Sequence, residues 1–129
     1  QLEVQNITCS DDVGKAINPI QVEGQIEGAL IQALGYGLME NFIQKDGKVL
    51  TKKLSTYLIP TALDIPDRID TRILEIPDPV GPWGARGVGE MPFIPLAPAL
   101  NSAVHNATGV WINHFPLTAE VVFSALNRD

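Results

Sequence analysis

The sequence has one cysteine, no basic cluster and no long apolar run. The single cysteine, Cys9, excludes an internal disulfide, a cysteine-rich metal site and an iron–sulfur cluster built from this chain alone. No stretch of 18 apolar residues is present that could cross a bilayer. A net charge of −6, without clustered lysines and arginines, argues against nucleic acid or an anionic membrane as a partner.

The start of the chain has no features of an exported protein. Residues 1–12 lack the basic start and apolar core of a signal peptide, and no initiator methionine is present. With the single cysteine, these features predict a cytoplasmic protein, and the chain begins as if cut from a longer one. The length of 129 residues is that of one domain, so we expect residues 1–129 to form a single domain fragment.

Alternating apolar and polar residues predict four or five strands. The segments that follow this pattern are residues 2–9, 68–77 and 110–115. Asp46-Gly47 between two extended runs adds a hairpin within residues 41–54. Because a hairpin interrupts the alternation of helices and strands, the pattern favours an α+β fold with a mixed sheet over a doubly wound parallel sheet.

Helical spacing of apolar residues predicts three helices. The first two cover residues 21–42 and 91–107, and Gly109 is expected to stop the second. The third follows Pro116, with Thr118 as its N-cap and Glu120 in its first turn.

The first predicted helix carries an unusual face. At about 100° per residue, Gln21, Gln25 and Gln32 fall within roughly 40° of one another. Gly24, Gly28 and Gly35 form a flat strip beside them, although glycine within a helix costs about 1 kcal/mol relative to alanine. Two explanations are open: close packing of another helix on the strip, or a bulky ligand that lies there while a glutamine amide reaches it.

The loop GPWGARGVGE, residues 81–90, places four glycines before a carboxylate, Glu90. Glycine lets the backbone approach another group closely. The pattern G-x-x-G-x-G-E differs from the dinucleotide-binding motif G-x-G-x-x-G. Met91-Pro92 suits the start of a helix, where partial positive charge favours an ionised carboxylate. Glu90 is therefore either a general base or a residue that caps or charges the helix start.

The sequence contains none of the common catalytic or metal-binding motifs. A serine nucleophile elbow, HExxH, CxxC and a P-loop are all absent. His105 and His114 have no second ligand at metal spacing, so we interpret both as structural histidines and expect no protein-bound metal. Cys9 lies in a predicted strand and is interpreted as a small buried apolar residue rather than a nucleophile.

Several separated motifs resemble one enzyme family. DVGKAINP, QVEGQIEGALIQALGYGLME, LSTYLIPTALDIP, GPWGARGVGE and ATGVWINHFPLTAEVVFSAL follow in this order over essentially the whole chain. Together they are similar to the C-terminal part of the molybdenum-binding subunit of the xanthine dehydrogenase, aldehyde oxidase and aerobic carbon monoxide dehydrogenase family. The resemblance implies an oxidoreductase that oxidises an electron-poor carbon of a purine, N-heterocycle or aldehyde with oxygen derived from water.

The resemblance also implies cofactors, partners and site residues. The cofactor would be molybdopterin with molybdenum, in its cytosine dinucleotide form, while the [2Fe–2S] clusters and FAD would belong to partner modules. Glu90 matches the family's general base, and Gly87, Val88 and Gly89 match backbone that lies close to the cofactor. Gln25, in its Q-x-E-G motif, matches a glutamine that hydrogen-bonds the pterin.

Two other functions are open. The chain could be an inactive scaffold or assembly module that docks on the rest of the subunit. It could also be a degenerate relative that binds a small ligand without redox chemistry. Even within the enzyme family, we expect the fragment to be inactive without the rest of its subunit.

Overall fold

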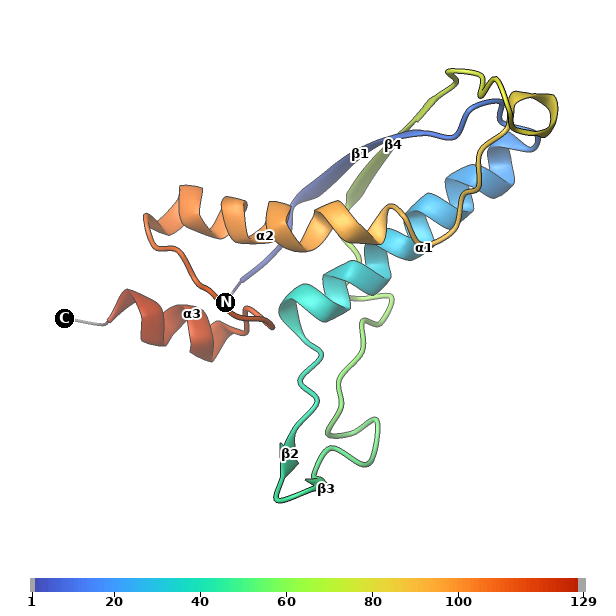
Figure 1. The fold of residues 1–129 in the computed structure, drawn as a ribbon. Helices are drawn as coiled ribbons and strands as arrows, with labels where there is room; N and C mark the ends of the chain where they lie inside the picture. The colour runs from blue at the N-terminus through green and yellow to red at the C-terminus, as the bar shows by residue number, and fades with distance from the viewer. Residues whose placement is uncertain (1, 128–129) are drawn as a thin grey trace.

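The structure is a computed structural model and describes residues 2–127. A long helix, α1 (Pro19–Leu38), runs through the centre of the molecule (Figure 1). Strands β1 (Asn6–Asp12) and β4 (Arg68–Leu74) lie together along one part of α1, and helix α2 (Phe93–Thr108) packs on it as well. Residues 39–66 leave this body as a projecting arm, and helix α3 (Ala119–Leu126) ends the described chain (Figure 1).

Helix α1 confirms the first predicted helix but has different ends. It begins at Pro19 because the side chain of Asn18 accepts a hydrogen bond from the Gln21 N–H at 3.2 Å, and proline suits the first helical position. It ends at Leu38, because the N–H groups of Met39 and Glu40 both donate to the carbonyl of Gly35. The arm therefore starts where the sequence pattern alone would continue the helix.

The expectation of one mixed sheet of four or five strands is wrong. The described chain has two separate two-stranded sheets: β1 pairs in parallel with β4, and β2 (Gln44–Lys45) pairs antiparallel with β3 (Lys48–Val49). The hairpin forms around Asp46-Gly47 as predicted, but it lies at the far end of the arm, where it cannot join the other strands (Figure 1).

Residues 110–115 are also not a strand. They have no regular secondary structure, bend at residues 114–115, and pair with neither sheet of the described chain. Ile112 is nonetheless buried, and its carbonyl accepts a hydrogen bond from the side chain of Asn101 at 2.9 Å. Burial on α2 accounts for the alternating pattern. The third helix begins as predicted, since Thr118 accepts a hydrogen bond from the Val121 N–H and Glu120 lies in the first turn.

The core lies between α1, α2 and the inner face of β1. The fully enclosed side chains include Val13, Ile26, Leu30 and Leu117. Many large apolar side chains stay exposed outside this core, among them Ile20, Leu63, Trp83 and Ile94. No helix in residues 2–127 combines the length and apolar character needed to cross a membrane.

Candidate functional site

The glycine-rich loop is attached to the turn between β1 and α1. The loop contains a short 3-10 helix, η1 (Pro82–Gly84), followed by a single bridge between Ala85 and Gly14. The Arg86 N–H donates to the carbonyl of Val13 at 2.9 Å, and the Lys15 N–H donates to the carbonyl of Gly84 at 2.7 Å. These bonds fix the first half of the loop against the N-terminal end of α1.

Gly14 is required for this attachment. Its φ of +63° lies in the left-handed region, where a side chain is strained. A Cβ atom at this position would lie 2.3 Å from the carbonyl oxygen of Gly84 and 3.0 Å from the Arg86 nitrogen. Only glycine therefore allows the turn and the loop to approach so closely.

Arg86 adds ion pairs to the same junction. Its Nη1 lies 2.8 Å from Asp12 Oδ2 and its Nε lies 3.3 Å from Asp78 Oδ2. Asp12 also accepts hydrogen bonds from the N–H groups of Gly14 and Ile76 through Oδ1. These two backbone donors, and then the Arg86 charge, hold the pKa of Asp12 below its ordinary value of 3.8.

The lowered pKa of Asp12 makes the loop attachment sensitive to acid. Because the folded-state pKa is below the ordinary value, the carboxylate stabilises the fold fully above about pH 4, and this contribution is lost as pH falls through the folded-state pKa. We expect the protection factors of the amides in residues 84–86, which correct for the intrinsic pH dependence of exchange, to fall below that pH but to stay level between pH 5 and 8. In Asp12→Asn the loss of protection on acidification should be smaller; an identical dependence of the protection factors on pH would contradict the role of Asp12.

A groove beside the loop brings two of the predicted cofactor-binding residues together. It has a volume of about 340 Å³, and Gln25 of α1 and Val88 of the loop both line it. Gln21, one helical turn before Gln25, lines the same groove, whereas Gln32 does not. In the sequence, Gln21 stood out because it shares a helical face with Gln25 and Gln32. The folded position of the glycine-rich loop shows that only Gln21 and Gln25 lie beside it.

Gly87 and Gly89 are not explained by contacts within the described chain. Neither has a φ in the left-handed region, and a Cβ atom added to either one would meet nothing within 4 Å. A cradle of bare backbone with open space above it fits a bulky group that approaches from outside the chain.

Of the three glycines in the strip on α1, one is explained by contacts within the chain and two are not. Close packing explains Gly35, whose added Cβ would lie 2.7 Å from the Pro60 ring. Gly24 and Gly28 instead face open space, with nothing within 4 Å of an added Cβ. Packing against another helix therefore does not account for these two glycines within the described residues.

Glu90 does not cap helix α2. The N-cap residue is Pro92, no side chain caps the helix, and the carbonyl of Glu90 accepts the Phe93 N–H at 3.1 Å. The prediction that Glu90 caps the helix is therefore wrong, and the prediction that its charge favours the helix start stays a prediction. The Glu90 side chain is exposed, and within residues 2–127 its carboxylate makes no hydrogen bond or ion pair. It does not line the groove that holds Gln25 and Val88.

Two other polar candidates, Cys9 and His105, make contacts within the described chain. Cys9 is buried, and its thiol donates to Asp11 Oδ2 at 3.0 Å; burial and the neighbouring Asp11 carboxylate raise the pKa of Cys9 to about 12. His105 stacks on Trp111 with ring centroids 4.1 Å apart. Across residues 2–127 no group of three or more potential ligands is arranged around a metal ion.

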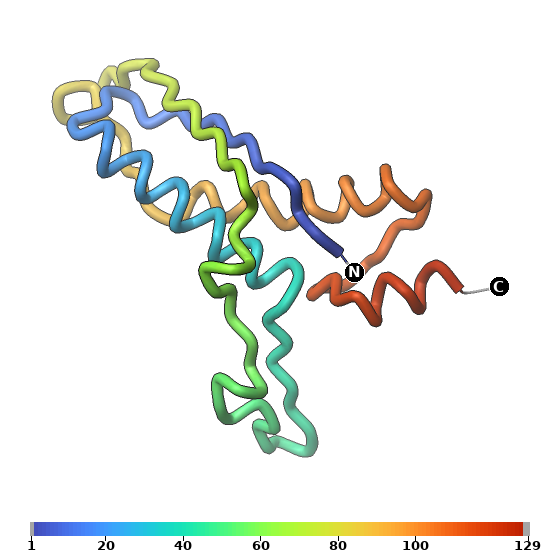
Figure 2. Tube along the Cα trace, turned by 180° about the vertical axis from the view of Figure 1, so that it is seen from behind, coloured from blue at the N-terminus to red at the C-terminus, as the bar shows by residue number. Residues whose placement is uncertain are grey.

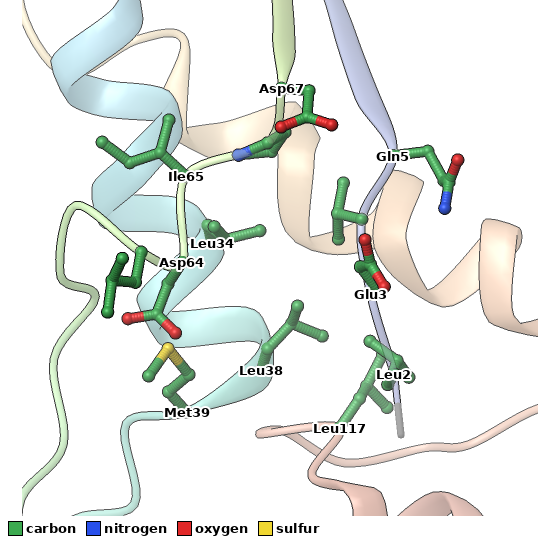
Figure 3. A pocket seen from close by; sticks show the side chains of 13 residues that line it. Leu2, Glu3, Gln5, Leu34, Leu38, Met39, Asp64, Ile65, Asp67 and Leu117 are labelled. Atoms are coloured by element: carbon green, nitrogen blue, oxygen red, sulfur yellow. The ribbon is translucent and has the colours of Figure 1, made fainter.

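A second cavity, of about 460 Å³, is shown in Figure 3, and no residue of the glycine-rich loop lines it. It is bounded by residues 2–5, the end of α1, residues 63–67 and Leu117. None of the predicted site residues lines it. Its polar side chains among the described residues are the amide of Gln5 and the carboxylates of Glu3, Asp64 and Asp67, so none of them is a cation that could hold an anionic cofactor.

Gln25 and Val88 line one groove, Gly87 and Gly89 carry no side chain beside it, and Glu90 lies exposed outside it. Residues 1–66 match the family model of the molybdopterin cofactor-binding domain. The chain belongs to this family. Its match includes Gln25, whereas the glycine-rich loop lies beyond it.

Individual relatives match nearly the whole chain. A probable xanthine dehydrogenase component of Bacillus subtilis is 38% identical over 98% of the chain, and a xanthine dehydrogenase molybdenum-binding subunit of Escherichia coli O157:H7 is 35% identical over 95%. The crystal structure of quinoline 2-oxidoreductase from Pseudomonas putida 86 superposes with a TM-score of 0.83, at 41% identity over 95% of the chain. These matches cover 17%, 16% and 16% of the respective relatives, so the chain spans about one sixth of their length.

Proposed function

We propose that the chain is the C-terminal cofactor-wall portion of the large subunit of a molybdenum hydroxylase. When bound, molybdopterin with molybdenum would supply the redox chemistry that oxidises an electron-poor carbon with oxygen from water. Gln25 would donate its amide to the pterin, residues 87–89 would offer bare backbone to the cofactor, and Glu90 would accept the proton of the attacking nucleophile. The cytosine dinucleotide form, partner modules that carry [2Fe–2S] clusters and FAD, and a cytoplasmic location belong to the same proposal.

The observation that carries the proposal is the unexplained openness of Gly87 and Gly89. A loop needs glycine where φ is positive or where atoms crowd the backbone, and neither condition holds here. The hydrogen bonds and ion pairs of Gly84 and Arg86 hold the first half of the loop in place. Residues 87–89 therefore follow a fixed anchor and keep their backbone accessible. A large planar cofactor against this backbone would explain both glycines.

Gly89→Val tests this observation. We expect the cofactor-free subunit to keep its melting temperature, because the added side chain meets no atom of this chain within 4 Å of its Cβ. Molybdenum and pterin content should fall by roughly tenfold or more, as the valine would occupy the cofactor's space. Normal cofactor content in the variant, measured by metal analysis, would contradict the proposed cofactor contact and would favour the alternative that the chain is an inactive scaffold.

Gln25→Ala tests the proposed pterin contact. A neutral hydrogen bond contributes about 0.5–1.5 kcal/mol net, so cofactor retention should weaken by roughly two- to tenfold. Gln32→Ala is the matched control, because it removes an exposed glutamine from the same helix but lies outside the groove. Equal molybdenum content in both variants after dialysis would assign Gln25 a role on the helix surface only.

A further inference from the structure

A further groove, distinct from the two cavities described above, runs along strand β1 on the side away from β4. It has a volume of about 680 Å³ and is lined by residues 2–8, by one face of α2 and by Val122 and Leu126 of α3. In both views β1 lies between β4 and α2 (Figures 1 and 2). Consecutive residues of the strand line the groove, so side chains of both orientations border it. The groove therefore follows the edge of β1 rather than one face of the sheet.

The backbone along this edge has no partner in the described chain. β1 pairs only with β4 in residues 2–127, and no other backbone hydrogen bond involves residues 6–11. A strand edge presents a row of N–H and C=O groups, which folded proteins normally pair or cover. Parallel sheets in particular occur as larger units covered by other elements, whereas this parallel pair has only two strands.

The opposite wall of the groove fits a strand that would pair with this edge. Ala99, Ala103 and Ala107 recur every four residues on α2, are exposed, and face the groove. Their small side chains leave room for the larger side chains of an incoming strand. Among the described residues, Glu3 is the only charged one in the lining, so an occupant with apolar side chains is favoured.

We propose that a β-strand from the part of the same subunit outside this chain fills the groove and pairs with the free edge of β1. The proposal rests on the chain being part of a longer subunit, as its one-sixth share of the relatives' length supports. The added strand presents apolar side chains to the alanine face of α2. The sheet of the whole subunit then has at least three strands, and main-chain pairing in the manner of β-augmentation joins the fragment to it.

Hydrogen exchange on the full-length subunit tests the pairing directly. In a two-stranded pair, only alternate amides of β1 point toward β4, and the others face outward. We expect every amide in residues 7–11 to be protected by roughly 100-fold or more over an unfolded chain. Alternate amides that exchange as freely as exposed ones would overturn the proposal.

A pair of matched variants tests the groove itself. Ala103→Glu places a charge in the groove, whereas Ser102→Glu places the same charge on an exposed neighbouring residue that does not line it. We expect Ala103→Glu to lower the yield of soluble full-length subunit by roughly fivefold or more and Ser102→Glu to leave it unchanged. Equal yields for the two variants would contradict the proposal.

Cross-linking identifies the occupant independently of the enzyme function. A cysteine introduced at Ala107, carrying a short photoreactive group, should link to a segment of the same polypeptide outside residues 1–129. A cross-link to a second copy or to another subunit would overturn the assignment of the occupant. These readouts do not depend on cofactor or turnover, so the strand pairing can fail while the molybdenum hydroxylase proposal stands, and the reverse also holds.

Discussion

Replacing Glu90 with glutamine in the full-length enzyme is expected to lower turnover by roughly 10²- to 10⁴-fold, the range typical for loss of a general base. Glutamine has nearly the same shape as glutamate but cannot accept a proton at neutral pH. Because the Glu90 carboxylate makes no hydrogen bond or ion pair within residues 2–127, the substitution removes no interaction that holds the described fold. Molybdenum and pterin content should therefore stay near the wild-type value.

The control for this prediction is Glu120→Gln. It removes the same charge from an exposed carboxylate in the first turn of α3, remote in sequence from the glycine-rich loop. We expect the control to turn over at the wild-type rate. Wild-type turnover in Glu90→Gln would refute the catalytic assignment. Low turnover accompanied by loss of the cofactor would instead give Glu90 a role in binding.

The sequence predicted the local elements that depend on short-range chemistry. Asp46-Gly47 specifies its hairpin through the conformations of two residues, and both have the positive φ angles that such a turn needs. Thr118 specifies a helix start through a single hydrogen bond to the third residue after it. Neither feature depends on distant parts of the chain, so the sequence pattern alone is sufficient for both.

The number and grouping of the strands could not be predicted in this way. β1 and β4 are separated by more than 50 residues, and their pairing depends on α1 returning the chain to the same place. Residues 110–115 have the alternation of a strand, yet burial of Ile112 on α2 produces the same pattern without a neighbouring strand. Alternation records which side chains are buried, and it does not record what buries them.

For the candidate site too, the sequence predicted some features and the fold alone revealed others. The motifs indicated Gln25 and Glu90, and the structure brings Gln25 and Val88 to one groove. The sequence did not indicate how the loop is held, because Gly14 and Asp12 occur in an ordinary turn motif. Only the folded chain shows that this turn meets the glycine-rich loop, more than 65 residues later, through Arg86 and Gly84. Gly14 therefore supports the site without being part of it.

Replacing Gly14 with alanine is expected to detach the first half of the loop. The left-handed φ of +63° costs a non-glycine residue about 1–2 kcal/mol. The added Cβ would also lie 2.3 Å from the Gly84 carbonyl oxygen, so the backbone must move apart. That movement breaks the Lys15–Gly84 and Arg86–Val13 hydrogen bonds, each contributing about 0.5–1.5 kcal/mol. The total cost is then about 2–5 kcal/mol.

Gly47→Ala separates the two contributions, because Gly47 has a similar φ of +72° but no atom within 4 Å of an added Cβ. Both variants should be destabilised by the left-handed φ angle. Only Gly14→Ala should speed amide exchange at Arg86, by roughly tenfold or more. Because a detached loop no longer presents residues 87–90, Gly14→Ala should also lose molybdenum, whereas Gly47→Ala should retain it. Equal exchange at Arg86 in the two variants would contradict the prediction. It would mean that a local adjustment separates the added Cβ from the Gly84 carbonyl oxygen, and that the ion pairs of Arg86 with Asp12 and Asp78 hold the loop.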